Sequence, residues 1–180
     1  MWKNDWYTSP YQRTWNDKDW NQPNQPVVCV SWYEAMVYTR WLTRETGLAV
    51  RLPTEAEWEK AARSADGRKY TWGDGLLTPA LANFGKNVGH TTAVGSYPNG
   101  ASPYGVLDMV GNVREWTSSL YRVYPYQPDD GREELEGANN RVVRGSSWND
   151  EAIVMRAALR YATAPFYENV ELGIRLVITF

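Results

Sequence analysis

The sequence predicts an α+β fold, because two well-marked helices come early, a loop-rich stretch follows, and short strand-like runs come last. The first helix is expected to begin after Ser31, since Glu34 three residues later completes a capping box. Its apolar residues recur at helical spacing until Gly47, a residue typical of helix ends. Thr54 and Glu57 repeat the capping box, so a second helix is expected there.

The remaining stretches are less regular. Residues 68–140 are rich in Gly, Pro, Asn and aromatic residues, and we predict loops that carry function or bind ions. Strand-like runs return at 141–144 and 174–180. Residues 1–25 show no periodicity and are interpreted as an irregular, aromatic-rich lead-in. With 180 residues, the chain is expected to form one domain over residues 1–180.

Charge and composition exclude several classes of protein. The net charge of −2 gives no basic surface, so we expect no nucleic-acid partner. No apolar run approaches the roughly 20 residues of a membrane helix, and the start of the chain does not resemble a signal peptide. The single cysteine, Cys29, excludes an internal disulfide and is expected to be a buried, inert thiol. The oligomeric state stays open.

Aromatic residues are unusually numerous, with ten tryptophans and twelve tyrosines. Most of these rings are expected to close the core, because each buries a large area. The others are suited to ligand contact, since Tyr and Trp combine a rigid apolar body with a polar tip.

Several short motifs follow one another between residues 26 and 178. They are 51–59 (RLPTEAEWE), 72–74 (WGD), 94–98 (VGSYP), 111–117 (GNVREWT), 144–148 (RGSSW) and 173–175 (GIR). In this order the chain resembles the formylglycine-generating-enzyme (sulfatase-modifying factor) type of C-type lectin domain. The resemblance implies two helices, small antiparallel sheets and long ordered loops.

The resemblance also bears on catalysis. The family includes a copper-dependent oxidase that uses two cysteines after the Gly-Ser-Trp motif, and the matching positions here hold Asp150 and Met155. His90 is the only histidine and is expected to be a solvated loop residue, so no Ser-His-Asp arrangement is available. The glutamates of residues 55–59 are interpreted as helix-capping and dipole groups. We therefore expect no catalytic residues and no enzyme activity.

One metal site is implied by the resemblance. In related enzymes the Gly-Asn-x-x-Glu stretch contributes to a calcium site, and this stretch corresponds to Asn112, Val113 and Glu115 here. Calcium prefers oxygen ligands of this kind. Alternatively, Glu115 pairs with an arginine. No other cofactor is expected.

The segment after Trp148 contains two kinds of position. Some positions keep the family pattern, and others hold chemically mixed residues. This division resembles the variable proteins of diversity-generating retroelements, in which adenines of Asn codons are randomised at exposed sites of a C-type lectin fold. The resemblance implies that residues 149–171 form a variable ligand-binding segment. The predicted contact residues are Asn149, Asp150, Ile153, Val154, Leu159, Tyr161, Thr163, Ala164, Phe166, Tyr167, Asn169, Val170 and Glu171.

A codon argument agrees with randomisation at most of these positions. Changing the two adenines of AAC or AAT reaches Ala, Val, Asp, Thr, Ile, Leu, Phe or Tyr, but never Lys, Gln, Met or Trp. Ten of the mixed positions satisfy this restriction. The alternative is that Ile153, Val154, Leu159 and Val170 are core residues of an ordinary family member.

The expected function is therefore recognition of a protein or surface ligand by a segment displayed on a virion or cell surface. Tyr161, Phe166 and Tyr167 are expected to be exposed on one face as aromatic anchors. Five residues that keep the family pattern are expected to hold the backbone in place. They are Arg144, Trp148, Arg156, Arg160 and Arg175. Two alternatives remain: an inactive formylglycine-generating-type domain that serves as a fixed interaction module, and an enzyme that uses carboxylates.

Overall fold

The computed structural model describes residue 14 and residues 17–180, so most of the predicted lead-in lies outside the described residues. Both predicted helices are present: α1 spans Trp32–Thr46 and α2 spans Glu55–Arg63. Each begins with the predicted capping box, and α1 ends at Gly47, whose φ of 71° suits glycine. A 3₁₀ turn, η3, covers Pro98–Gly100.

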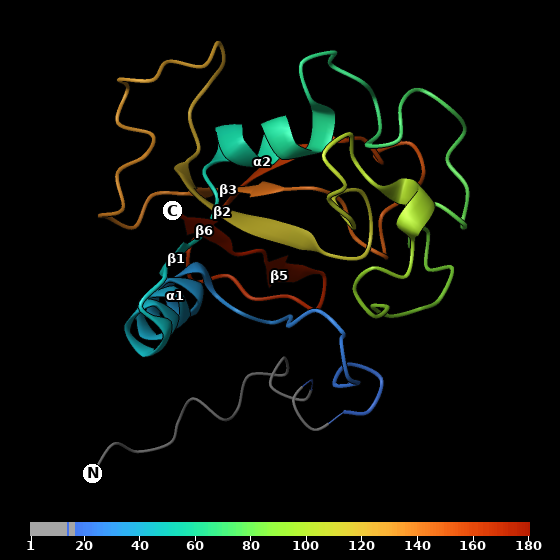
Figure 1. Cartoon of the computed structure of the whole chain (residues 1–180), viewed down its shortest axis with the longest axis horizontal. Coiled ribbons are helices and arrows are strands. Elements are labelled where there is room, and N and C mark those ends of the chain that lie inside the picture. Colours follow the sequence, from blue (N-terminus) through green and yellow to red (C-terminus); the bar gives the residue numbers. More distant parts are fainter. Residues whose placement is uncertain (1–13, 15–16) are drawn as a thin grey trace.

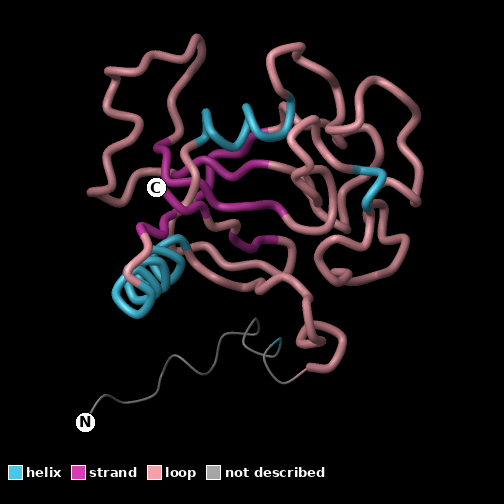
Figure 2. The backbone as a smooth tube through the Cα atoms, in the orientation of Figure 1, coloured by secondary structure: helices cyan, strands magenta, loops and turns pink. Residues whose placement is uncertain are grey.

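The strands form two small sheets. β1 (Ala49–Arg51) pairs antiparallel with β6 (Val177–Thr179). The second sheet has the order β4-β3-β2-β5, with β4 at Arg160–Thr163, β3 at Arg141–Arg144, β2 at Arg114–Leu120 and β5 at Leu172–Ile174. β2 and β5 run parallel, so this sheet is mixed rather than purely antiparallel. Figure 1 shows α2 above the four-stranded sheet and α1 below it, and Figure 2 shows how much of the chain is loop.

Each helix closes its own hydrophobic cluster. Trp58 and Ala62 of α2 pack with buried residues that include Met109 and Met155. Trp32 and Ala35 of α1 pack in a second cluster, which includes residues of β2, β3 and β5. This is the architecture of a C-type lectin fold, with two helices, small sheets and long loops.

Strand β2 departs from the prediction of loops over residues 68–140. Its sequence, REWTSSL, is mostly polar, yet six of its seven residues are buried. Hydrogen bonds make this burial possible: the Thr117 hydroxyl donates to the Val142 carbonyl, and the Ser119 hydroxyl donates to the Glu133 carboxylate. The predicted run 174–180 is also divided, because β5 ends at Ile174 and β6 begins at Val177.

Two further features concern the start of the described chain. Trp20 packs on the domain, with its ring centroid 5.6 Å from that of Trp148 and 6.4 Å from that of His90. Cys29 is half-buried rather than fully buried, and burial raises the pKa of its thiol to about 11. Among the described residues, no helix combines the length and apolar character that crossing a membrane requires.

Candidate functional site

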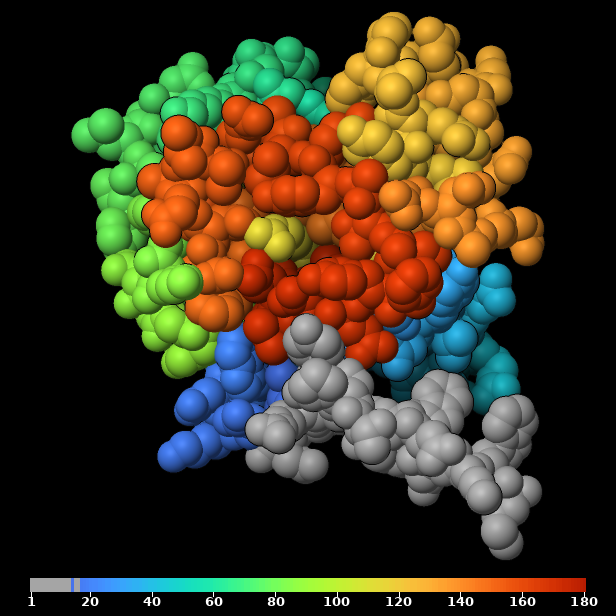
Figure 3. All heavy atoms as spheres, turned by 180° about the vertical axis from the view of Figure 1, so that it is seen from behind, coloured from blue at the N-terminus to red at the C-terminus, as the bar shows by residue number. Residues whose placement is uncertain are grey.

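The predicted binding residues gather on one face of the molecule. Figure 3 shows this face, where orange and red chain surrounds a hollow with yellow atoms at its floor. The hollow is a cavity of about 380 Å³. Its lining residues are Arg114, Val143, Tyr161, Ala162, Thr163, Ala164, Tyr167, Asn169 and Leu172.

None of the predicted contact residues is buried. Ile153 is 87% exposed, Phe166 70% and Tyr167 45%. The remaining members of the set, including Val154 and Leu159, are partly exposed. Of the four residues in the core alternative, Ile153 is exposed, and Val154, Leu159 and Val170 are partly exposed.

Tyr161 differs from the expectation of an exposed anchor. It lies in β4, is only partly exposed, and packs against the hydrophobic cluster of α1. The Arg114 guanidinium lies 4.8 Å from the centre of its ring. Burial raises the pKa of Tyr161, and the nearby charge of Asp150 acts in the same direction. Tyr161 thus forms the wall of the cavity rather than a protruding contact.

Arg114 connects the beginning, middle and end of the segment. From strand β2 its guanidinium donates hydrogen bonds to both oxygens of Asp150, and it lies 2.9 Å from the Glu171 carboxylate. Burial acts to lower the pKa of Arg114, but the hydrogen bonds and charge of Asp150, with contributions from Tyr161 and Glu171, raise it above its ordinary value. We call Arg114, Asp150, Tyr161 and Glu171 the Arg114 cluster.

The polar neighbours of the Arg114 cluster also bond to one another. The Ser147 hydroxyl lies 3.2 Å from the Asp150 carboxylate and 3.0 Å from that of Glu171. The amide of Asn149 donates to Glu171 over 2.6 Å. Asn149, Asp150 and Glu171 were predicted as contact residues, and the structure places them in a network that links the two ends of the segment.

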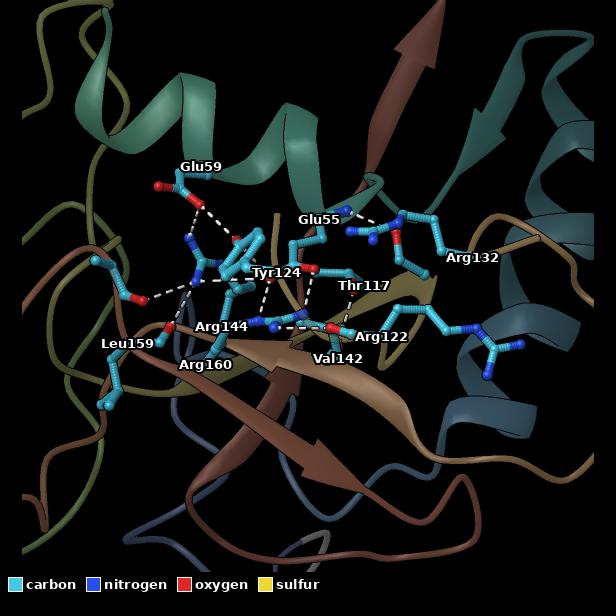
Figure 4. A network of polar contacts seen from close by, with 12 residues as sticks. Glu55, Glu59, Thr117, Arg122, Tyr124, Arg132, Val142, Arg144, Leu159 and Arg160 are labelled. Atoms are coloured by element: carbon cyan, nitrogen blue, oxygen red, sulfur yellow. Dashed lines mark hydrogen bonds and ion pairs between the residues drawn. The ribbon is translucent and has the colours of Figure 1, made fainter. Parts of the chain in front are cut away.

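A buried set of charges lies behind this face, between α2 and the four-stranded sheet (Figure 4). Glu55 is 1% exposed and receives two hydrogen bonds from Arg160, at 2.6 and 2.7 Å. Arg144, fully buried, donates to Glu59 and to the carbonyls of residues 158 and 159. The Tyr124 hydroxyl bridges the two glutamates. We call Glu55, Glu59, Tyr124, Arg144 and Arg160 the frame network.

Trp148, Arg156 and Arg175 were also predicted to hold the backbone, and the structure does not agree with this prediction for all three. Trp148 is buried, with its indole nitrogen 3.4 Å from the Val170 carbonyl. Arg175 binds Glu115 and the Leu107 carbonyl. The prediction for Arg156 is wrong: its side chain is exposed and makes no hydrogen bond or ion pair to the described residues. It follows the buried Met155, so its side chain points away from the core.

Two of the three residues of the predicted calcium site, Asn112 and Glu115, bind other groups in the structure. Glu115 accepts hydrogen bonds from Arg175 and from the Trp58 indole, which corresponds to the arginine pairing left open by the sequence. The Asn112 side-chain oxygen accepts a hydrogen bond from the backbone of Thr92. Calcium at Asn112, Val113 and Glu115 would have to replace these contacts, and it stays a prediction. In the described part of the chain, no three His, Cys, Asp or Glu side chains form a group that could hold a metal ion.

Sequence reasoning missed two residues that organise the site. Arg114 was read only as part of a motif, although its side chain joins residues far along the chain. Glu55 was interpreted as a helix-dipole group, yet it is the buried acceptor of Arg160. No local signal distinguishes either residue, because their partners lie far away in the sequence.

The fold and this face define a C-type lectin domain of the formylglycine-generating type. The chain belongs to the family of the sulfatase-modifying factor enzyme 1-like domain, whose pattern matches residues 3–180.

Two named proteins are similar to this chain in sequence. It is 40% identical over 167 residues to a hercynine oxygenase of Mycolicibacterium thermoresistibile, covering 86% of this chain and 36% of that protein. It is 36% identical over 183 residues to a formylglycine-generating enzyme of Streptomyces coelicolor, covering 86% of this chain and 52% of the relative. The chain thus spans from about a third to about half of the length of these relatives.

Solved structures of related proteins share the fold. PvdO from Pseudomonas aeruginosa superposes with a TM-score of 0.77 and 31% identity, over 89% of this chain and 64% of that one. Treponema denticola variable protein 1 superposes with a TM-score of 0.70 and 27% identity, over 87% of this chain and 72% of that one.

These relatives correct one expectation. The sequence led us to expect that the chain is not an enzyme, because Asp150 and Met155 stand where the oxidase has cysteines. Relatives with 35–40% identity over most of this chain are named as enzymes, so that expectation is wrong. The lack of the two cysteines argues only against the copper-dependent oxidase reaction, which is one chemistry of the family.

Proposed function

We propose that this chain recognises a target molecule through the face formed by residues 149–171. The observation that carries the proposal is that every predicted contact residue is at least partly exposed, whereas three residues that lie between them, Met155, Ala157 and Pro165, are buried. Exposed apolar side chains beside polar groups on a rigid backbone are typical of binding surfaces. Phe166 and Tyr167 would supply contact area, and the cavity beside Tyr161 would receive part of the partner.

We propose further that a diversity-generating retroelement varies these positions, and that the chain is displayed on a virion or cell surface. The mixed residues, the codon restriction and the fold shared with a variable protein of Treponema denticola support this. The test is sequencing of the gene from many cells of one population. Substitutions should concentrate at the contact codons and spare those of Arg144 and Gly173. An even spread of substitutions, or the lack of an adjacent near-repeat that differs at adenines, would contradict diversification.

The recognition proposal has a separate test in a display library. One library randomises Ile153, Phe166, Tyr167 and Asn169, and a matched library randomises the same number of buried positions, Arg144, Trp148, Ala157 and Gly173. Most members of the first library should fold and be displayed, and most of the second should not. Selection of the first library on immobilised proteins should then yield binders. If both libraries fold equally poorly, the surface is not a variable one.

Similarity to hercynine oxygenases favours a second candidate function, substrate binding for an oxygenase reaction. Oxygenases activate O₂ with a metal or a flavin. The described residues do not fit a metal centre, so such a group would come from outside them. Under this proposal hercynine would bind in the cavity at Tyr161 and Arg114. Calorimetry with hercynine tests it: loss of binding in Tyr161→Ala would support it, and no binding by the wild-type protein would contradict it.

A further inference from the structure

Helix α1 lies at the edge of the domain (Figure 1), and its outer side carries aromatic and apolar side chains. Tyr33, Val37 and Trp41 follow one another at intervals of four residues, which places them in a row along one side of the helix. All three are exposed, and Val37 is 65% exposed. Tyr38 is also exposed and stacks on Trp41, with the ring centroids 5.6 Å apart. We call Tyr33, Val37, Tyr38 and Trp41 the α1 face.

The opposite side of α1 already packs in the core. Trp32, Ala35, Met36 and Thr39 are buried there, so the helix joins the domain without using the α1 face. Single exposed apolar side chains are common on monomeric proteins, but a contiguous group of large ones marks a contact surface. The α1 face is therefore a candidate surface for another molecule.

The charges beside the α1 face are divided between its two ends. Glu34 lies in the first turn of α1, close to Glu168, and neither carboxylate has an ion pair within the described chain. Burial raises the pKa of Glu168, and the neighbouring charge of Glu34 raises it further. In the second half of α1, Arg44 lies 3.1 Å from Glu45, whereas Arg40 has no ion pair with the described residues. The helix therefore has a negative start and a net positive second half.

We propose that two copies of this chain associate through the α1 face, with their two helices antiparallel. Val37 and Trp41 flank Thr39, the middle residue of α1, so an antiparallel pair brings Val37 of each copy near Trp41 of the other. The negative start of each helix then lies beside the positive second half of the other, whereas a parallel pair would bring like charges together. The inference does not depend on the proposed recognition function, since no predicted contact residue belongs to the α1 face.

The test is sedimentation equilibrium of the full chain from micromolar to millimolar concentration. One helix face is a small interface, so the dimer should be weak and should dissociate within this range. Val37→Asp should weaken dimerisation at least about tenfold, because a symmetric dimer would bury the new charge twice. Leu76→Asp, at an exposed position in a loop, is the matched control and should leave dimerisation unchanged. Circular dichroism checks that both variants are folded.

A charge reversal tests the antiparallel arrangement. Arg40→Glu should weaken dimerisation about threefold or more, and Arg156→Glu, at an exposed position without an ion pair, should not change it. Three results would overturn the proposal: a chain that stays monomeric throughout the range, an unchanged dimer in Val37→Asp, and equal effects of the two charge reversals. Binding of a monomeric chain to phosphatidylglycerol vesicles, lost in Trp41→Ala, would assign the α1 face to a lipid surface instead.

Discussion

The frame network and the face formed by residues 149–171, the proposed recognition face, meet at Arg160, yet they are built in opposite ways. Arg160 of this segment and Arg144, which precedes it, point toward α2 and are held by its glutamates. Ile153 and Phe166, a few residues away, point into solvent. The backbone is thus fixed from behind by partners outside the segment. Its outward side chains can change without loss of those contacts, and this is the property that a variable binding surface requires.

The Arg114 cluster lies between these extremes. Its arginine is fixed in β2, but its carboxylates, Asp150 and Glu171, belong to the segment itself. Substitution of either carboxylate would leave Arg114 with part of its charge uncompensated. The two ends of the segment should therefore tolerate fewer residue types than Ile153 or Phe166.

The largest effect is expected in the frame network. Glu55→Gln removes the charge that accepts Arg160 and also lies 3.8 Å from the buried Arg144. Breaking a buried ion pair from one side typically costs about 3–5 kcal/mol, because the other charge stays buried. Urea unfolding measures the loss, and the exposed Glu151→Gln is the matched control. A loss of less than about 1 kcal/mol would mean that the network does not hold the segment.

An intermediate effect is expected for Arg114→Met. The side chain is 24% exposed, so solvent offsets part of the loss, and we expect about 1–3 kcal/mol. Hydrogen exchange should rise at residues 149–171 and remain unchanged in α1. The control is Arg156→Met, which removes an exposed arginine with no ion pair. Equal effects of the two substitutions would show that the Arg114 cluster has no positioning role.

A smaller, pH-dependent effect is expected at the exposed edge of α2. Arg51 binds Glu57, and this hydrogen bond lowers the pKa of Glu57 from 4.5 to about 2. A carboxylate with a lowered pKa stabilises the fold above its unfolded pKa, and this contribution is lost as pH falls from 4.5 toward 2. Because both side chains are more than a third exposed, the contribution should be below about 1 kcal/mol.

The measurement is the unfolding free energy of the wild type and Glu57→Gln at pH 7 and at acid pH. The difference between the two proteins should shrink as pH falls through this window. A difference that stays constant would show that the Glu57 charge does not contribute.

The sequence predicted the parts whose signals are local. Ser31 with Glu34, and Thr54 with Glu57, fixed the helix starts, since each capping box lies within four residues. β2 was not predicted, because its serines and threonine are buried only through bonds to partners such as Val142 and Glu133. A polar strand buried in this way has no periodic pattern.

In the site, too, only features with local signals in the sequence were predicted. Alternation of fixed and mixed residues indicated that Ile153 and Phe166 are exposed, as the structure shows. The bond from Arg114 to Asp150 spans 36 residues, and no spacing along the chain indicates it. The exposed position of Arg156 was missed for a related reason: the pattern of the family identifies which residue recurs, but not which way its side chain points.

The smallest effect on stability is expected on the recognition face, and it separates the two regions most directly. Ile153 and Met155 are two residues apart, but Ile153 is 87% exposed and Met155 is fully buried in the cluster with Trp58. Ile153→Asn should change the unfolding free energy by no more than about 0.5 kcal/mol, whereas Met155→Ala should cost about 2–5 kcal/mol. Urea unfolding of both variants provides the measurement. If Ile153→Asn were as costly as Met155→Ala, then Ile153 would be part of the core, and the surface could not vary as the proposed function requires.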